Sequence, residues 1–434
     1  MKRDFVFVGI IGFGTVGTGT VKILLSNSEI IRERTGLDIR LKRIADLDIE
    51  RDRGVSLPEG VLTTRVDDIL GDPEIDIVIE LIGGIHPARD FILRAIRNRK
   101  HVVTANKALL ATEGNEIFEE AEKNGVSIGF EASVAGGIPI IKVMQEGLVA
   151  NRILNIYGII NGTSNYILTK MTEEDKDFSS ALKEAQDLGY AEADPTFDIE
   201  GIDSAHKLTI LSSLAYGIPL SYNQVYREGI TRISTQDMVF ARELGYKIKL
   251  LAITKAVDGE IEMRVHPTMI PQDYMIAKVD GVYNAIYVEG DAVGSTLYYG
   301  RGAGDMPTGS AVVADVVDIG KRIGVNRSKG EYSFLRPSNL RIRKMEDIES
   351  MYYFRFSAID KPGVLSKISG ILGDNNISIA SVIQKGRRIG GAVPLVVLTH
   401  KAKESGVLRA IKAIDDLPIV TEPTHFIRVE GKEE

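Results

Sequence analysis

The chain has 434 residues, 44% of them hydrophobic and 26% charged, as is typical of a globular protein with two to four domains. Its formal net charge of −7 and the lack of a basic stripe with interleaved aromatic residues disfavour nucleic acid as a partner. Zero cysteines exclude disulfides, thiolate metal sites and a thiol nucleophile, and the lack of a long apolar run predicts a cytoplasmic protein without a membrane span.

A glycine-rich turn lies between the first expected strand, residues 5–11, and the first expected helix, residues 15–33. Gly12, Gly14 and Gly17 form a G-x-G-x-x-G pattern in the strand–turn–helix context that gives the pattern its meaning. The first glycine permits the tight turn, the second lets a pyrophosphate approach, and the third lets helix and strand pack closely. Because a helix N-terminus attracts phosphate, the motif predicts a dinucleotide site.

The second expected strand, residues 39–45, ends at Asp46. An acidic residue at this place suits the ribose hydroxyls and favours NAD. The same region is rich in basic residues that would accommodate a 2′-phosphate: Arg40, Lys42, Arg43, Arg51 and Arg53. Since a solvated strand edge would explain these charges equally well, the choice between NAD and NADP stays open.

Further buried strands alternate with helices up to about residue 135. The strands are expected at residues 76–82, 102–104 and 126–130, and the helices at 87–99 and from 105 onward. This alternation predicts an α/β fold with a Rossmann-type, doubly wound parallel sheet, whose ligands bind at the carboxyl ends of the strands. The residues expected at such ends are Gly12, Ile82, Lys107 and Glu131.

The rest of the chain predicts two more domains. Residues 136–335 mix helices and strands as an α+β catalytic and dimerisation domain, and a helix near 308–323 is expected to complete the nucleotide-binding domain of residues 1–135. Residues 336–350 are an expected linker. Residues 351–434 show the order βαββαβ, which is the ferredoxin-like arrangement.

An acidic loop at residues 189–203 leads into a helix that carries Lys207. Asp203 and Lys207 are four residues apart and share one helix face, where an exposed pair would contribute only a few tenths of a kcal/mol. The density of carboxylates indicates a site for a cationic group such as a substrate ammonium, with a lysine whose pKa depends on burial and neighbouring charge. Lys107 could face the same cleft, or it could be an exposed lysine at a helix start.

The loop of residues 131–139 offers one carboxylate and many carbonyl oxygens, which are ligands that hard cations prefer. The residues alone favour a glycine turn into a helix over a cation site. Six histidines occur without H-x-x-x-H or H-E-x-x-H spacing, so we expect no catalytic zinc.

Several segments in order resemble the homoserine dehydrogenases, over essentially the whole chain. They are GFGTVG at 12–17, TANK at 104–107, EASVAGGIP at 131–139, NGTSNYIL at 161–168, GYAEADPTFDIEGIDSAHKL at 189–208 and GRGAGDMPTGSAVVAD at 300–315. The C-terminal unit resembles an ACT domain, through the turn DKPGVL at 360–365 and the amphipathic helix after it.

This resemblance implies a reversible, NAD(P)-dependent interconversion of L-homoserine and L-aspartate 4-semialdehyde, in threonine and methionine biosynthesis. It implies that Lys207 is the proton donor, with Asp203 near the substrate and Lys107 at the substrate or the nicotinamide. Glu192 and Asp198 are the expected substrate-binding carboxylates. With the residues above, the expected cofactor contacts are Gly12, Phe13, Gly14, Thr15, Val16, Gly17, Asp46, Ile82, Lys107 and Gly309.

The resemblance also implies a monovalent cation, most simply sodium, and an amino-acid effector, with L-threonine as the obvious one. The cation would be held by Glu131 and backbone carbonyls of Val134, Gly136 and Ile138. The effector would contact Asp360, Gly363, Val364, Asn376 and Ile377. A homodimer or homotetramer is expected, and the C-terminal unit could instead serve assembly by pairing sheets between subunits.

Two other functions remain open. One is a related oxidoreductase for another amino-acid aldehyde, and the other is a catalytically inactive sensor that binds an amino acid and NAD(P). The joint presence of Lys107, Glu192, Asp203 and Lys207 with an intact glycine motif argues against the sensor.

Overall fold

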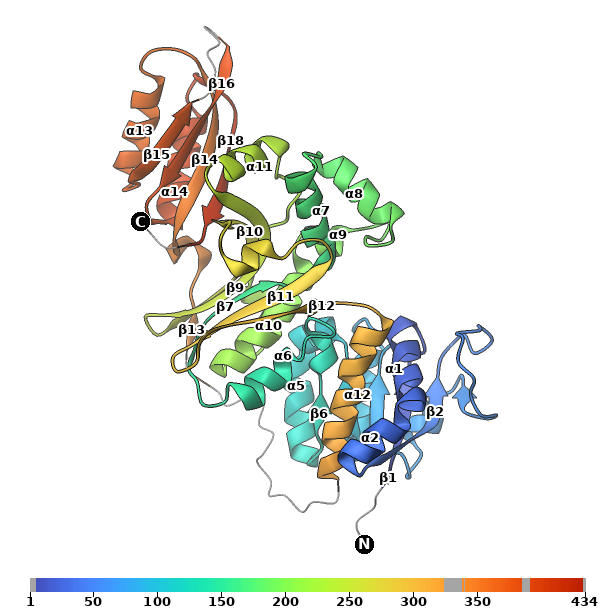
Figure 1. Cartoon of the computed structure of the whole chain (residues 1–434). Coiled ribbons are helices and arrows are strands. Elements are labelled where there is room, and N and C mark those ends of the chain that lie inside the picture. The colour runs from blue at the N-terminus through green and yellow to red at the C-terminus, as the bar shows by residue number, and fades with distance from the viewer. Residues whose placement is uncertain (1–4, 324–337, 339, 385–390, 432–434) are drawn as a thin grey trace. The chain divides into compact units, whose positions relative to one another are not determined.

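The computed structural model describes residues 5–323, 338, 340–384 and 391–431 (Figure 1). The chain divides into two compact units. The first comprises Met1–Gly162, Asp203–Val225 and Tyr283–Leu340, and the second comprises Thr163–Ile202, Tyr226–Val282 and Arg341–Glu434. The expected linker begins among residues that lie outside the described ones, and its later part contains the short strand β13 (Arg341–Ile342).

A six-stranded parallel sheet lies at the centre of the first unit. Its strands are β1 (Phe5–Ile11), β2 (Asp38–Ala45), β3 (Leu62–Thr63), β4 (Ile77–Glu80), β5 (His101–Thr104) and β6 (Ile128–Gly129). They follow the order β3-β2-β1-β4-β5-β6 with parallel pairing throughout. This order confirms the Rossmann-type fold, and its reversal beside β1 creates the crevice in which such folds bind ligands.

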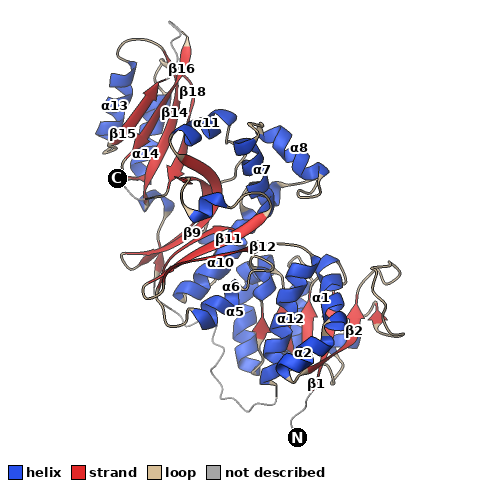
Figure 2. Ribbon diagram, in the orientation of Figure 1, coloured by secondary structure: helices blue, strands red, loops and turns tan. Residues whose placement is uncertain are grey.

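Helices cover both faces of this sheet (Figure 2). They are α1 (Thr15–Ser26), α2 (Ser28–Thr35), α3 (Asp67–Leu70), α4 (Ala88–Arg97), α5 (Lys107–Asn124) and α12 (Asp305–Arg322). The prediction of a single helix at residues 15–33 is therefore wrong, because the helical conformation is interrupted at Asn27, between α1 and α2. Helix α12 returns from far along the chain, and its Val312 and Val316 share a core with Val8 and Ile10 of β1.

The first unit also contains antiparallel strands, of which β7 (Ile153–Ile159) ends near the cluster of Asp203, Lys107 and Lys207 described below. Strand β7 pairs with β11 (Tyr283–Gly290), and β11 with β12 (Gly294–Arg301). Strand β12 was not expected from the sequence, because its residues GSTLYYGR lack a clear apolar–polar alternation. The other helical segments are the 3₁₀ turn Glu131–Ser133, α6 (Ile140–Lys142), the π-helical turn Val143–Gly147, α10 (Ile202–Tyr216) and the 3₁₀ turn Tyr222–Gln224.

The second unit joins the middle of the chain to its C-terminus. Its middle part contains α7 (Gly162–Glu173), α8 (Phe178–Asp187), α9 (Thr196–Ile199), β8 (Tyr226–Arg227), α11 (Thr235–Glu243), β9 (Tyr246–Val257), β10 (Glu260–Pro271) and the 3₁₀ turn Met275–Lys278. Strands β9 and β10 form a long antiparallel hairpin that turns at Asp258 and Gly259, both in the left-handed region.

The C-terminal part of the second unit consists of a sheet with the helices α13 and α14. Its elements are the 3₁₀ turn Met345–Asp347, β14 (Glu349–Ile359), α13 (Val364–Asp374), β15 (Ile379–Gln384), β16 (Ala392–Thr399), β17 (Ala402–Lys403), α14 (Glu404–Asp415) and β18 (Val420–Val429). The order β18-β14-β16-β15 confirms the ferredoxin-like arrangement. Strand β18 also pairs with β10, at Thr268–Arg428 and Met269–Val429, so one sheet runs through both parts of the unit.

Buried ion pairs reinforce this continuous sheet. Arg264 of β10 is fully buried and contacts Glu430 at 2.6 Å. Arg428 of β18 contacts Glu404 at 2.5 Å and Glu228 at 2.8 Å. The Arg264–Glu430 and Arg428–Glu228 pairs join the middle of the chain to its C-terminal part, so the two parts stabilise each other. The Arg428–Glu404 pair lies within the C-terminal part.

Asp237 forms another buried contact between the middle of the chain and its C-terminal part. Its side chain is 0% exposed, completes a capping box with Ser234 at the start of α11, and lies 2.7 Å from Arg355 of β14. Burial by itself would raise the pKa of this carboxyl, but the Arg355 guanidinium and the adjacent His425 hold it below its ordinary value. Tyr353 donates a further hydrogen bond to the same carboxylate.

Replacement of Asp237 by alanine is expected to lower the free energy of unfolding by about 3–5 kcal/mol, because it leaves Arg355 buried without its partner. Denaturant titration measures this difference. Asp187→Ala is the control, because Asp187 forms an exposed pair with Lys183 and should contribute less than about 1 kcal/mol. Equal losses in the two variants would show that Asp237 has no special role.

Among the described residues, we find no helix with the length and apolar character that a membrane span requires.

Candidate active site

The glycine turn after β1 has the geometry of a pyrophosphate cradle. Gly12 has φ 102°, and a Cβ atom there would lie 2.8 Å from the Leu81 carbonyl oxygen. A Cβ at Gly17 would lie 2.3 Å from the Gly12 carbonyl oxygen, so glycine is required there for close packing. A Cβ at Gly14 would meet no described atom within 4 Å, which leaves the start of α1 open to a ligand. These residues fit a dinucleotide.

The other expected cofactor residues take several positions. Phe13 is buried, Thr15 is exposed, Val16 is half-buried, and Ile82 is 39% exposed in the turn after β4. Gly309 lies in α12 against α1, where a Cβ would come within 2.7 Å of the Thr20 backbone nitrogen. Glycine at position 309 is therefore explained by helix packing, whatever it does toward a cofactor.

Asp46 and Arg53 lie together beside the glycine turn. Asp46 accepts a hydrogen bond from the Phe13 backbone N–H at 2.5 Å, and Arg53 donates to the Phe13 carbonyl at 2.5 Å. The Arg53 guanidinium lies 3.3 Å from the Asp46 carboxylate and 4.7 Å from the centre of the Phe13 ring. Of the five basic residues considered from the sequence, Arg53 thus lies beside Asp46, the acidic residue expected to contact the ribose.

A buried cluster of one carboxylate and two lysines lies at the carboxyl end of β7. Asp203 is 3% exposed and Lys207 is 7% exposed. The Asp203 Oδ2 atom lies 2.7 Å from Lys207 Nζ, and its Oδ1 atom lies 3.0 Å from Lys107 Nζ. The pair is therefore not the exposed helix pair that is the simplest reading of its spacing.

The two lysines of this cluster favour the ionised form of Asp203. Burial by itself would raise the pKa of this carboxyl, but the Lys207 and Lys107 ammonium groups hold it well below its ordinary value. Lys207 also donates to the Ile160 carbonyl at 2.6 Å, so its ammonium has a defined position. The Lys107 side chain is 37% exposed and extends from the cluster toward solvent.

The sequence analysis did not single out Asn161, which belongs to this cluster. Its side-chain amide donates to Asp203 Oδ2 at 3.0 Å from the turn that follows β7. The available signal was its place directly after a strand, where polar side chains of an α/β site gather. Asn161 holds the Asp203 carboxylate between the two lysines.

Glu192 and Asp198 belong to the second unit. Glu192 is exposed, and its backbone carbonyl accepts a hydrogen bond from Gln186 at 3.1 Å. Asp198 is half-buried in α9, and its carbonyl accepts a hydrogen bond from Ser164 at 3.0 Å. Both side chains are accessible, as carboxylates that bind a substrate must be.

The expected cation loop is a buried turn, with Glu131, Val134, Gly136 and Ile138 all within the first unit. The Glu131 carboxylate accepts hydrogen bonds from the backbone N–H groups of Ile141 and Lys142, each at 2.8 Å. Its oxygens therefore hold the start of α6. Among the described residues, no group of three acidic or histidine side chains could hold a metal. A cation bound by backbone carbonyls stays a prediction.

Two neighbouring carboxyls, Glu131 of this turn and Asp315 of α12, predict a pH-dependent stability. Burial raises the pKa of Glu131 to about 7 and that of Asp315 to about 8, and Asp315 accepts a hydrogen bond from the Glu131 N–H. The unfolded chain loses these protons at lower pH than the folded chain does. Stability should therefore fall as the pH rises from about 4 to 8, by at most about 1.4 kcal/mol per pH unit for each group.

Asp315→Asn removes one of these two titrating groups and should flatten the dependence. Denaturant titrations at several pH values between 4 and 8 measure the slope for both proteins. An unchanged slope would mean that Asp315 titrates alike in the folded and unfolded chains.

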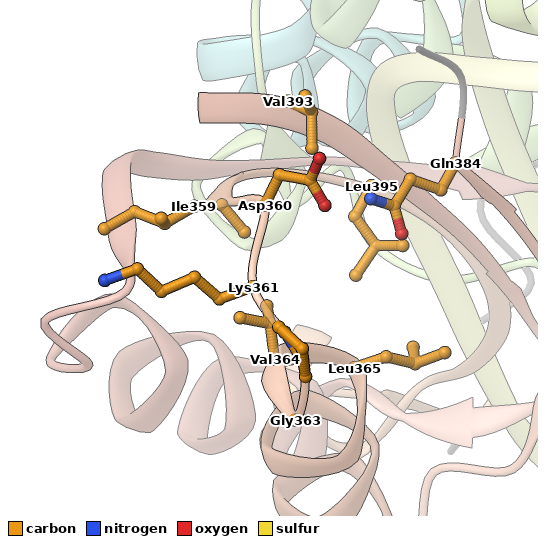
Figure 3. A pocket seen from close by; sticks show the side chains of 11 residues that line it. Ile359, Asp360, Lys361, Gly363, Val364, Leu365, Gln384, Val393 and Leu395 are labelled. Carbon is orange, nitrogen blue, oxygen red and sulfur yellow. The ribbon is translucent and has the colours of Figure 1, made fainter. Parts of the chain in front are cut away.

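A cavity of about 210 Å³ opens at the end of β14 in the second unit (Figure 3). Of the expected effector residues, Asp360, Gly363 and Val364 line it. Asn376 is exposed with φ 59°, and Ile377 is buried in the core, and neither belongs to the lining. The sequence analysis missed Gln384, Val393 and Leu395, which reach the cavity from the neighbouring strands β15 and β16.

The chain matches three family models in order. The NAD-binding domain of homoserine dehydrogenase matches residues 12–131, the homoserine dehydrogenase model matches residues 139–317, and the ACT domain matches residues 352–417. A homoserine dehydrogenase from Pseudomonas aeruginosa is 49% identical over 430 residues, which are 98% of each chain. The chain belongs to the homoserine dehydrogenase family.

Solved structures agree with this assignment. A homoserine dehydrogenase from Thiobacillus denitrificans is 49% identical, covers 98% of each chain and superimposes with a TM-score of 0.93. A hyperthermophilic archaeal homoserine dehydrogenase in complex with NADPH is 28% identical, covers 73% of this chain and 97% of its own, and superimposes with a TM-score of 0.62. The family acts as oxidoreductases on a CH–OH group with a nicotinamide cofactor, which agrees with the cradle at Gly12–Gly17.

Proposed function

We propose that this chain interconverts L-homoserine and L-aspartate 4-semialdehyde, with Lys207 exchanging the proton of the substrate oxygen. The bound nicotinamide supplies or accepts the hydride. The buried cluster of Asp203, Lys107 and Lys207 carries the proposal, because a held ammonium at a strand end can stabilise negative charge on a neighbouring oxygen.

Asp203 holds both lysines, so each ammonium keeps a defined place without a substrate. In aldehyde reduction Lys207 donates a proton to the developing alkoxide. In alcohol oxidation a neutral Lys207 accepts that proton, so oxidation should be favoured at alkaline pH. Lys107, which is more exposed, reaches toward the substrate or the nicotinamide region.

Glu192 and Asp198 of the second unit are proposed to bind the substrate ammonium. The accessibility of their side chains and the resemblance support this role. A monovalent cation, most simply sodium, is proposed for the backbone carbonyls of Val134, Gly136 and Ile138 next to Glu131. The turn has the left-handed residues Ala135 and Gly136, with φ values of 55° and 50°, which change the direction of successive carbonyls.

We further infer that the C-terminal cavity binds an amino acid, with L-threonine as the effector. The Asp360 carboxylate and the Gln384 amide end on the same side of the cavity, and Val364 and Leu395 supply an apolar wall (Figure 3). An amino acid has the ammonium, the carboxylate and the small side chain that such a set of groups can contact. The alternative role in assembly predicts no threonine binding.

Self-association as a homodimer or homotetramer is also proposed. Three apolar residues are exposed on or beside the antiparallel strands of the first unit: Leu154 on β7, Val293 in the turn between β11 and β12, and Tyr299 on β12, with exposed fractions of 37%, 47% and 56%. An interface between copies of the chain would bury such residues. Light scattering of the purified protein measures the mass.

The deciding experiment is homoserine-dependent reduction of NAD⁺ and of NADP⁺, each with and without L-threonine. Activity with a preference for one cofactor and inhibition by threonine would support the whole proposal. Activity without inhibition would keep the reaction and assign the C-terminal part to assembly. Cofactor binding without turnover would favour the sensor, and turnover of another amino alcohol only would favour the related oxidoreductase.

A further inference from the structure

A buried carboxylate that the mechanism does not use lies at the carboxyl end of β4. Glu80 is 0% exposed, in a strand whose other residues are apolar. Its Oε1 atom accepts hydrogen bonds from the backbone N–H groups of Ile82 at 2.8 Å and Gly83 at 3.3 Å. Glu80 therefore shapes the turn that follows β4, which borders the glycine turn where Leu81 faces Gly12.

The other oxygen of Glu80 reaches the neighbouring strand. Thr104, its direct partner on β5, donates its hydroxyl proton to Glu80 Oε2 at 2.7 Å. The Thr104 oxygen in turn accepts the backbone N–H of Asn106 at 3.0 Å. Because a hydroxyl has one proton, this chain of hydrogen bonds runs from Asn106 through Thr104 to the carboxylate when Glu80 is ionised. Burial raises the pKa of Glu80, and the hydrogen bonds from Thr104, Ile82 and Gly83 counter this rise.

Two branches of hydrogen bonds thus start at Glu80, one through Thr104 and one through the turn after β4. Asn106 connects the Thr104 branch to Lys107 and also contacts the turn. Its side-chain oxygen caps α5 by accepting the Leu109 N–H at 3.1 Å, and its amide group donates to the Gly84 carbonyl at 2.6 Å. Lys107 is the first residue of α5, directly after this cap. The turn after β4 and the start of α5 are thus tied to each other and to one carboxylate.

We infer that Glu80 is a positioning residue, which through Thr104 and Asn106 sets the place of Lys107 and, through Ile82 and Gly83, the place of the turn beside the cofactor. This inference rests on the proposed role of Lys107 in the reaction. A buried carboxylate is expensive unless several donors satisfy it. Hydrogen bonds from Ile82, Gly83 and Thr104 converge on Glu80. The arrangement links the position of Lys107 to that of the turn beside the cofactor.

The two branches can be separated by matched substitutions. Thr104→Val keeps the shape of the side chain and removes the hydroxyl, so it cuts only the branch to Lys107. Glu80→Gln replaces one of the two accepting oxygens by an amide that donates and removes the negative charge that both oxygens share, so it weakens both branches. Thr104→Ser keeps the hydroxyl and is the conservative variant that should rescue the effect.

The experiment measures kcat, the KM for homoserine, and the dissociation constant of NADPH by fluorescence, well below each variant's Tm. We expect Thr104→Val to lower kcat/KM at least about tenfold with NADPH affinity within about threefold, and Thr104→Ser to recover to within about twofold. Glu80→Gln should weaken NADPH binding as well. Should Glu80→Gln fail to fold, the Thr104 pair still decides the branch to Lys107.

The same measurements in a Lys107→Ala background distinguish positioning from a general structural role. If Thr104 acts through Lys107, adding Thr104→Val to Lys107→Ala costs less than about twofold more. An effect as large as in the wild-type background would overturn the inference. Normal activity of Lys107→Ala alone would instead contradict the proposed role of that lysine.

Discussion

Replacement of Lys207 by alanine is expected to lower kcat about 10²- to 10⁴-fold while cofactor affinity stays nearly unchanged. Lys207 is held by Asp203 and the Ile160 carbonyl, at the end of β7 rather than in the glycine turn. Positioned proton transfer contributes a factor of this size to enzymatic rates. Steady-state kinetics in both directions, with NADPH binding followed by fluorescence, measure the split.

Two controls make this result specific to proton transfer. Lys183→Ala removes an exposed lysine of α8 and should leave kcat within about twofold. Small primary amines added to Lys207→Ala should restore part of the rate, in proportion to amine basicity for alcohol oxidation. A kcat within about threefold of the wild type would exclude Lys207 as the proton donor.

Replacement of Asp360 by alanine is expected to raise the half-inhibitory concentration of threonine about 10- to 100-fold, without a change in uninhibited turnover. Asp360 lines the cavity at the end of β14, and a hydrogen bond to a charged group contributes about 1.5–3 kcal/mol. Inhibition curves and calorimetric titration of threonine should show the same loss.

The neighbouring Lys361 provides the matched control. Lys361 also lines the cavity, but its side chain extends away from the Asp360 carboxylate and the Gln384 amide, so Lys361→Ala should shift inhibition less than about twofold (Figure 3). Threonine inhibition that persists unchanged in Asp360→Ala would place the effector outside this cavity.

Deletion of the C-terminal part is a poorer test of regulation than point substitutions in the cavity. Arg264 contacts Glu430, and Asp237 contacts Arg355, each pair joining the middle of the chain to its C-terminal part. Truncation would leave buried charges unpaired, at a cost of several kcal/mol for each pair. A truncated chain that lost activity would therefore report on stability, and point substitutions in the cavity avoid this ambiguity.

Local sequence pattern was sufficient to predict much of the fold of this protein. The glycine spacing after β1, the buried strands that alternate with helices, and the βαββαβ order at the C-terminus each depend on neighbours within a few residues. The same is true of the place of Asp203 and Lys207 on one helix face. The glycine motif and the fold class could therefore be predicted before any long-range contact was known.

Tertiary structure decided what those residues do. The spacing of Asp203 and Lys207 is equally compatible with an exposed pair, and only the end of β7 and the start of α5 bury it and add Asn161 and Lys107. Glu80 looks like one polar residue in an apolar strand until β5 brings Thr104 beside it. The pairing of β18 with β10 likewise has no local signal. Burial and charge pairing depend on residues far apart in the chain, so sequence spacing names the candidates and the folded chain determines their chemistry.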